Sequence, residues 1–140
     1  MKLVSLAFTL ALTSAPLAYA SADGSGKCWN YWDVAQATIQ LDTMSQHFQE
    51  QLNAMPAFQP LSPSAVTLNE NADSFYAVVE AGPTCSKIRQ EFKKIDASYA
   101  RLYWDYTVAR RTNYNKDVDA AFMRTHLAYN RLKLNVKFSY

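Results

Sequence analysis

The sequence predicts an all-α protein, namely an up-and-down four-helix bundle with a short second helix and one disulfide. The strongest observation lies in residues 84–111, where apolar residues recur at alternating spacings of three and four. This spacing keeps one face of a helix apolar for about seven turns, as in a helical bundle. A similar stripe runs through residues 29–55, and no segment shows the two-residue alternation of a half-buried strand. The longer stripe consists of Cys85, Ile88, Phe92, Ile95, Tyr99, Leu102, Tyr106 and Ala109.

The first predicted helix covers residues 29–55 and ends before Pro56, because the residue that precedes a proline is pushed out of the α region. Its stripe consists of Val34, Ala37, Leu41, Met44, Phe48, Leu52 and Met55. The next segment, residues 56–67, holds three prolines and no charged residue. We expect this segment to be an extended connection, which is long for a bundle.

The second predicted helix is short and covers residues 68–81. Gly82 suits the left-handed conformation that ends many helices, and Pro83 cannot continue the helix. Thr84 is then expected to cap the long third helix through its side-chain oxygen.

The fourth predicted helix begins at Asn113 or Asn115 and has two apolar sides. A helix that is apolar on two sides is covered on both. Either residues 56–67 cover the second side, or a second copy does so in a homodimer formed through this helix. We expect the polar flank of the same helix to be a solvated edge. The second apolar side consists of Met123, Leu127, Leu134 and Phe138, and the polar flank of Asp119, His126, Lys133 and Lys137.

Residues 1–20 have the pattern of a secretory signal peptide. A lysine follows the first methionine, residues 3–12 are mostly apolar, and residues 18–20 form a small-x-small cleavage pattern. The apolar run is too short to cross about 30 Å of hydrocarbon. We therefore expect the chain to be exported, not membrane-embedded.

Cleavage is expected after Ala20 or Ala22. The remaining residues, 21–140, are enough for a single helical-bundle domain with its own core. Its expected location is the periplasm or the outside of the cell.

The two cysteines, Cys28 and Cys85, are expected to form a disulfide, since the chain is exported. In an up-and-down bundle the first and third helices begin at the same end. Each cysteine lies close to one of these two beginnings. The bridge would close a loop of 57 positions and contribute about 4 kcal/mol in the chain-entropy account.

The net charge of +2 hides an asymmetry along the chain. Residues 21–86 hold one base against seven acids, a net charge of −6, and residues 87–140 hold twelve bases against five acids, a net charge of +7. In one interpretation the two halves pack together and their charges satisfy one another. In the other, the C-terminal helices present a basic surface to an anionic partner.

No catalytic motif is recognisable in the sequence. His47 and His126 are its only histidines, and it contains no GxSxG, HExxH, glycine-rich phosphate loop or paired-cysteine metal motif. We therefore expect a protein without catalytic activity and without a cofactor. Nucleic acid is not an expected partner of an exported chain.

One pattern supports an alternative, a small copper or haem carrier. His47 and His126 each follow a methionine by three residues, so thioether and imidazole would project from the same side of a helix. Antiparallel packing of the first and fourth helices would bring Met44 and His126 to within roughly 3 Å of the same level. Such ligands suit Cu(I) or haem iron. The simpler interpretation puts the first methionine in the core and the second histidine on the solvated edge. The alternative site consists of Met44, His47, Met123 and His126.

The third helix also carries an aromatic–arginine cluster that lies partly off its apolar stripe. Such side chains either pack on a neighbouring helix or form an exposed patch of the kind enriched in protein interfaces. The expected function is accordingly protein–protein interaction, in an accessory, inhibitor, immunity or chaperone-like role with a protein partner of unknown identity. The candidate surface consists of Tyr103, Trp104, Arg101, Arg110 and Arg111.

Overall fold

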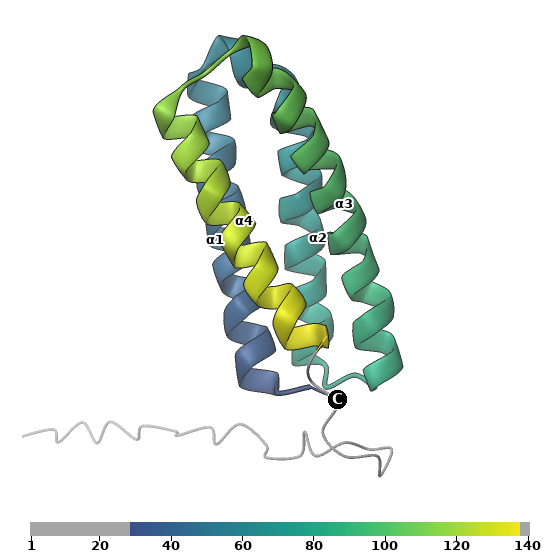
Figure 1. Cartoon of the computed structure of the whole chain (residues 1–140). Helices are drawn as coiled ribbons and strands as arrows, with labels where there is room; N and C mark the ends of the chain where they lie inside the picture. Colours follow the sequence, from purple (N-terminus) through teal and green to yellow (C-terminus); the bar gives the residue numbers. More distant parts are fainter. Residues whose placement is uncertain (1–28, 138–140) are drawn as a thin grey trace, which may run out of the picture.

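The computed structural model describes residues 29–137, and this part of the chain is all-helical, as predicted. Four α-helices and one short 3-10 helix follow one another without a strand in the described residues. Successive α-helices run in opposite directions, so the bundle is up-and-down (Figure 1). The elements are α1 (Tyr31–Ala54), η1 (Pro56–Leu61), α2 (Ser62–Glu80), α3 (Cys85–Thr112) and α4 (Lys116–Lys137). The predicted signal peptide, Cys28 and Phe138 lie outside the described residues.

Local sequence explains where the helices begin and end. The side chains of Asn30, Thr84 and Asn115 accept hydrogen bonds from backbone N–H groups two or three residues later and so cap α1, α3 and α4. The prediction for Thr84 is confirmed, and Asn115 rather than Asn113 opens the fourth helix. Gly82 has a φ of 64°, a conformation that only glycine adopts without steric cost, and it follows α2 directly after Ala81.

The predicted extended connection over residues 56–67 is wrong. Residues Pro56–Leu61 form η1, and α2 begins at Ser62, six residues before the predicted start. Pro63 lies in the first turn of α2, where its missing N–H has no intrahelical acceptor to lose. Phe58 is buried, so the connection packs onto the core. The second helix, with 19 residues, remains the shortest of the four.

All four helices contribute to one core. The periodic stripes predicted in the first and third helices supply most of their buried residues, which confirms those stripes as core-facing. The largest fully buried side chains are Phe48, Phe75, Leu41, Leu52, Leu68, Ile88, Ile95, Leu102, Leu132, Val34, Val79 and Val118.

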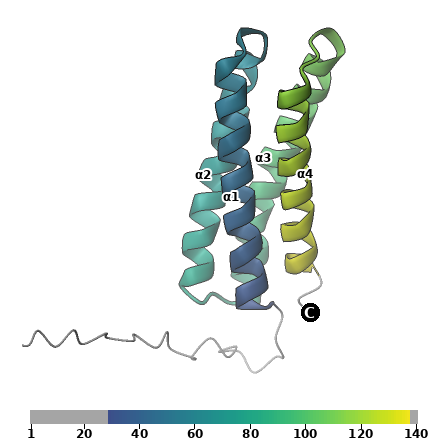
Figure 2. The same cartoon turned by 90° about the vertical axis from the view of Figure 1, so that its left-hand side faces the viewer.

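The helices are arranged in the cyclic order α1, α2, α3, α4. α1 packs against both α2 and α4, and α3 packs against α2. The backbones of α3 and α4 stand farther apart than those of the other neighbours, and large aromatic side chains bridge them. We call the α1–α2 pair one layer of the bundle and the α3–α4 pair the other. The α3–α4 layer faces the viewer in Figure 1 and is seen from the side in Figure 2.

The second apolar side of α4 is exposed in the structure of the described residues. Met123, Leu127 and Leu134 are 47%, 63% and 53% exposed, so η1 and the start of α2 do not cover them. Among the described residues no helix combines the length and the apolar character that a membrane span requires. Residues 56–67 are therefore not the cover of this side of α4, contrary to the first of the two expectations.

Candidate functional site

A row of hydrogen-bonded tyrosines fills the wide space between α3 and α4. Tyr99 stacks on Tyr129 with ring centroids 3.7 Å apart, and Tyr106 stacks on Phe122 at 3.9 Å. These four rings are almost completely buried. Because each tyrosine hydroxyl needs a partner when its ring is buried, α3 and α4 must supply polar groups along this row.

The central group is Tyr99 with His126. The tyrosine hydroxyl of α3 hydrogen-bonds to the imidazole Nδ1 of α4, and Asn130 lies 3.0 Å from Nε2. The Asn130 atom at this distance is the amide nitrogen Nδ2, which donates to Nε2, so Nδ1 carries the N–H that is directed at the Tyr99 oxygen. His126 is therefore fixed at both nitrogens and half-buried.

The two outer groups each pair a tyrosine with a carboxylate and a cation. Tyr106 donates to Asp119 at 2.5 Å, and Arg110 forms an ion pair with the same carboxylate at 2.8 Å. Burial, followed by this hydrogen bond, raises the pKa of Tyr106, so the hydroxyl stays protonated at neutral pH.

At the other end of the row, Tyr129 donates to Asp96, and Lys133 lies 3.3 Å from that carboxylate. Burial raises the pKa of Tyr129 as well, and the bond to Asp96 adds to the effect. All three groups hold the long α3 and α4 helices in one register.

The predicted solvated edge of α4 is thus wrong for three of its members. Asp119, His126 and Lys133 follow one another at spacings of seven, and all three take part in the row on the α3 side. Tyr99 and Tyr106 have the same spacing on α3. This matched spacing of seven was the sequence signal that could have revealed the row, because residues seven apart lie on one side of a helix.

The two histidines of the alternative metal site have other hydrogen-bonding or charged neighbours in the described structure. Thr125 of α4 donates to the carbonyl oxygen of Met44 at 3.0 Å, so the predicted match in level between the two helices is confirmed. His126, one residue on, faces Tyr99 on α3, whereas His47 lies 3.7 Å from Glu50 on α1. No cluster of three or more His, Cys, Asp or Glu side chains that could hold a metal ion occurs in residues 29–137.

The predicted interaction surface is divided among three sides of α3. Trp104 is 64% exposed and Arg111 is exposed as well. Tyr103 lies toward α4, with its ring 6.0 Å from that of Phe122. Arg110 faces α4 too, whereas Arg101 faces α2 and pairs with Asp105 at 3.0 Å.

Exposed apolar side chains concentrate on the α3–α4 hairpin. Nine large hydrophobic residues are exposed among those described, and seven of them lie in this hairpin. α2 contributes none, and α1 contributes Trp32 and Ile39. Scattered exposed hydrophobic residues need no explanation, but a concentration on one side of a protein indicates an interaction site. The seven are Tyr103, Trp104, Val108, Tyr114, Met123, Leu127 and Leu134.

The two layers of the bundle also differ in charge. Between Tyr31 and Glu80 the chain has six carboxylates and no lysine or arginine, whereas α3 and α4 hold twelve bases and five carboxylates. The ion pairs identified in the basic layer use that layer's own carboxylates, Glu91, Asp96, Asp105 and Asp119. Hydrogen bonds from Lys87, and then from Lys94, lower the pKa of Glu91 accordingly. The two layers therefore carry net charges of opposite sign.

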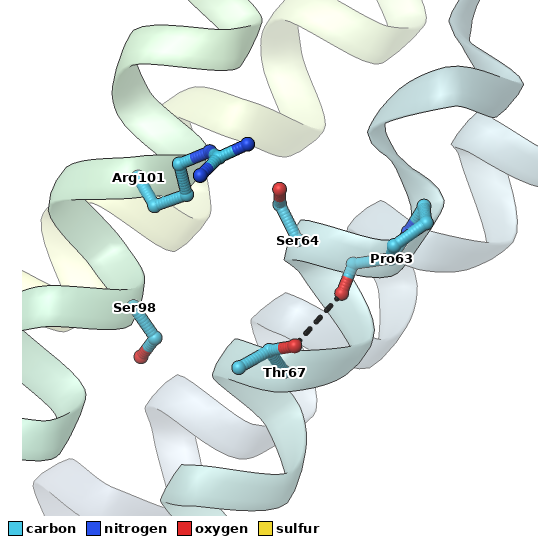
Figure 3. A pocket seen from close by; sticks show the side chains of 5 residues that line it. All are labelled: Pro63, Ser64, Thr67, Ser98 and Arg101. Carbon is cyan, nitrogen blue, oxygen red and sulfur yellow. Dashed lines mark hydrogen bonds between the residues drawn. The ribbon is translucent and has the colours of Figure 1, made fainter.

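A small pocket between α2 and α3 adds no site of its own. Figure 3 shows the side chains that line it. Its volume is about 200 Å³, below the range of about 300–1,000 Å³ typical of small-molecule sites. Its hydroxyl groups already donate within the protein: Thr67 to the carbonyl of Pro63 at 3.0 Å, and Ser64 to Asp105 at 2.6 Å. The lining consists of Pro63, Ser64, Thr67, Ser98 and Arg101.

One carboxyl group of the acidic α1–α2 layer, that of Asp42, has a raised pKa. Asp42 on α1 accepts a hydrogen bond from Asn69 on α2 at 2.6 Å. Partial burial, and then the negative charge of Asp73, raise its pKa. A carboxyl group with a raised pKa in the folded state costs stability when it is ionised, and this cost disappears as the pH falls below its ordinary value of about 3.9.

Replacing Asp73 by asparagine should therefore stabilise the bundle at neutral pH. We expect a gain of about 0.5 kcal/mol at pH 7 that vanishes below about pH 4, since both carboxyl groups are then protonated. Urea unfolding at the two pH values measures the difference. Glu70→Gln, on the same helix, removes an equal charge away from Asp42 and should not reproduce the pH-dependent gain.

The fold defines the chain as an all-α four-helix bundle whose α3–α4 layer is basic and apolar on its outer side. Comparison of the sequence and structure with protein-family models, curated proteins and solved structures finds no match.

Proposed function

We propose that this chain is an exported, non-catalytic helical-bundle protein that acts by binding another protein through its α3–α4 layer. The observation that supports the proposal most is the concentration of exposed aromatic and aliphatic side chains on this layer. Protein interfaces are enriched in tryptophan, tyrosine, methionine and arginine, and this layer exposes all four residue types.

Export and the disulfide belong to the same proposal. Residues 1–20 act as a cleaved signal, and Cys28 bridges to Cys85 after export. Cys85 is the first residue of α3, and α1 and α3 begin at the same end of the bundle, which supports the bridge (Figure 1). Mass determination of the protein in the exported fraction tests the cleavage point.

Replacing Trp104 by alanine should reduce capture of the partner from the native exported fraction by about ten-fold or more, because a buried interface tryptophan is often an energetic hot spot. The matched control is Trp32→Ala. The two tryptophans are 64% and 67% exposed, but Trp32 lies on α1, in the acidic layer. Quantitative mass spectrometry of the captured proteins measures the effect.

Both substitutions should leave the free energy of unfolding within about 0.5 kcal/mol of the parent, since both side chains are on the surface. Retention of every partner by Trp104→Ala, or equal losses with both variants, would remove the α3–α4 layer from the proposal.

A further inference from the structure

We propose that the partner of the α3–α4 layer is an acidic protein segment with large apolar anchors, and not a second copy of this chain. This inference rests on the proposed function and names the chemistry of the partner. It concerns one surface, the outer α3–α4 face, which consists of Lys93, Ala100, Trp104 and Arg111 on α3 and Lys116, Met123, Leu127 and Leu134 on α4.

Helix geometry gives this face its shape. On each helix the four residues follow one another at spacings of seven, four and seven, so they form a narrow stripe. α3 and α4 are joined by the short loop after Thr112 and run antiparallel. The two stripes therefore flank the same solvent-facing side of the hairpin, and all eight residues are exposed.

The face combines apolar and basic groups. Trp104 and Leu127 are 64% and 63% exposed, which leaves large apolar areas in water. Lys93, Arg111 and Lys116 are exposed and form no ion pair with any described residue. Four of the five carboxylates in the layer are already held by other bases. A partner that covers this face must therefore supply both negative charge and apolar anchors.

A second copy does not meet these requirements. In a symmetric dimer the same patch meets itself, so the basic groups of the two copies would face each other. Like charges across an interface are unfavourable by a large amount. The acidic layer of a second copy would supply charge, but its exposed large hydrophobic residues are only Trp32 and Ile39 among those described, and neither belongs to α2.

An anionic lipid surface would also supply negative charge and apolar groups, and the vesicle experiment below distinguishes it from a protein.

Site-specific photocross-linking in the cell of origin tests the inference on the full chain. The photoreactive residue p-benzoylphenylalanine replaces Ala100, on the outer face, or Ser74, an exposed position on α2 that serves as the matched control. After irradiation, the conjugate is purified and the cross-linked peptide is sequenced by mass spectrometry.

The probe at position 100 is expected to give a conjugate with a different protein, joined at a segment of net negative charge that contains large apolar residues. The yield should be at least about five-fold lower for the probe at position 74. Adding Arg111→Glu should lower the yield at position 100 about ten-fold, because a like charge then faces the partner. Arg124→Glu changes the net charge equally but lies outside both stripes, so it should lower the yield less than about two-fold.

Other outcomes overturn the inference in distinguishable ways. A conjugate with a second copy, with a neutral or basic segment, or only from position 74 contradicts the stated partner but leaves a protein partner in place. No protein conjugate from either position removes the proposed function as well. Binding to phosphatidylglycerol vesicles that Trp104→Ala abolishes, without a protein conjugate, would instead assign the face to membranes.

Discussion

Replacing Phe48 by alanine is expected to lower the free energy of unfolding by about 3–5 kcal/mol. The side chain is fully buried on α1, and its ring lies 6.0 Å from that of Tyr106 on α3 and 5.6 Å from that of Phe122 on α4. Truncation removes apolar burial and leaves a cavity where three helices meet, and helices cannot close such a gap without moving apart from other partners. Urea unfolding followed by circular dichroism measures the loss.

Phe48 should be this sensitive because it packs beside the tyrosine row. The stacked pair of Tyr106 and Phe122 forms one wall of its site, and the hydrogen bond from Tyr106 to Asp119 fixes that wall. Trp32→Ala removes a larger ring from the same helix at a 67% exposed position and should change the stability by less than about 0.5 kcal/mol. Similar effects of the two substitutions would contradict the assignment of Phe48 to the core.

Sequence alone could predict much of this fold, because the helical stripes are local patterns. The first and third helices were predicted at residues 29–55 and 84–111 and are observed at Tyr31–Ala54 and Cys85–Thr112. The error at residues 56–67 came from treating every proline as a helix breaker. A proline in the first turn, such as Pro63, is compatible with a helix, and only its position relative to the helix start separates the two cases.

The candidate site was harder to predict because it depends on which helix faces which. His126 was assigned to a solvated edge, since its neighbours on that side of the helix are charged. The structure shows that the same side faces α3, where Tyr99 provides the partner. A single helix pattern contains no information about the neighbour, so only a comparison of the heptad spacing on two helices could have indicated this contact.

The distribution of charge follows the same principle. The sequence revealed an acidic and a basic half, but two interpretations remained. The cyclic helix order decides how they meet: α1 and α2 form one layer, and the bases of the other layer pair with its own carboxylates. The twelve bases of α3 and α4 outnumber the five carboxylates of the same layer, which is the property that a basic outer surface requires.

Replacing Cys85 by serine is the second substitution with a large expected effect, a loss of about 4 kcal/mol in the free energy of unfolding. The proposed bridge to Cys28 closes a loop of 57 positions, which includes all of α1, η1 and α2. In the chain-entropy account such a link restricts the unfolded chain more than the folded one. For a domain stable by about 5–15 kcal/mol, this loss is a large fraction of the total.

Urea unfolding of the oxidised protein, the reduced protein and the Cys85→Ser variant measures this contribution. The reduced protein and the variant should lose similar amounts of stability, because both lack the same bridge. Ser86→Ala is the matched control, since it alters the neighbouring exposed residue in the first turn of α3 without affecting a thiol. If both thiols of the exported protein react with an alkylating reagent before reduction, the bridge does not exist, and α1 and α3 are then held at their common end by packing alone.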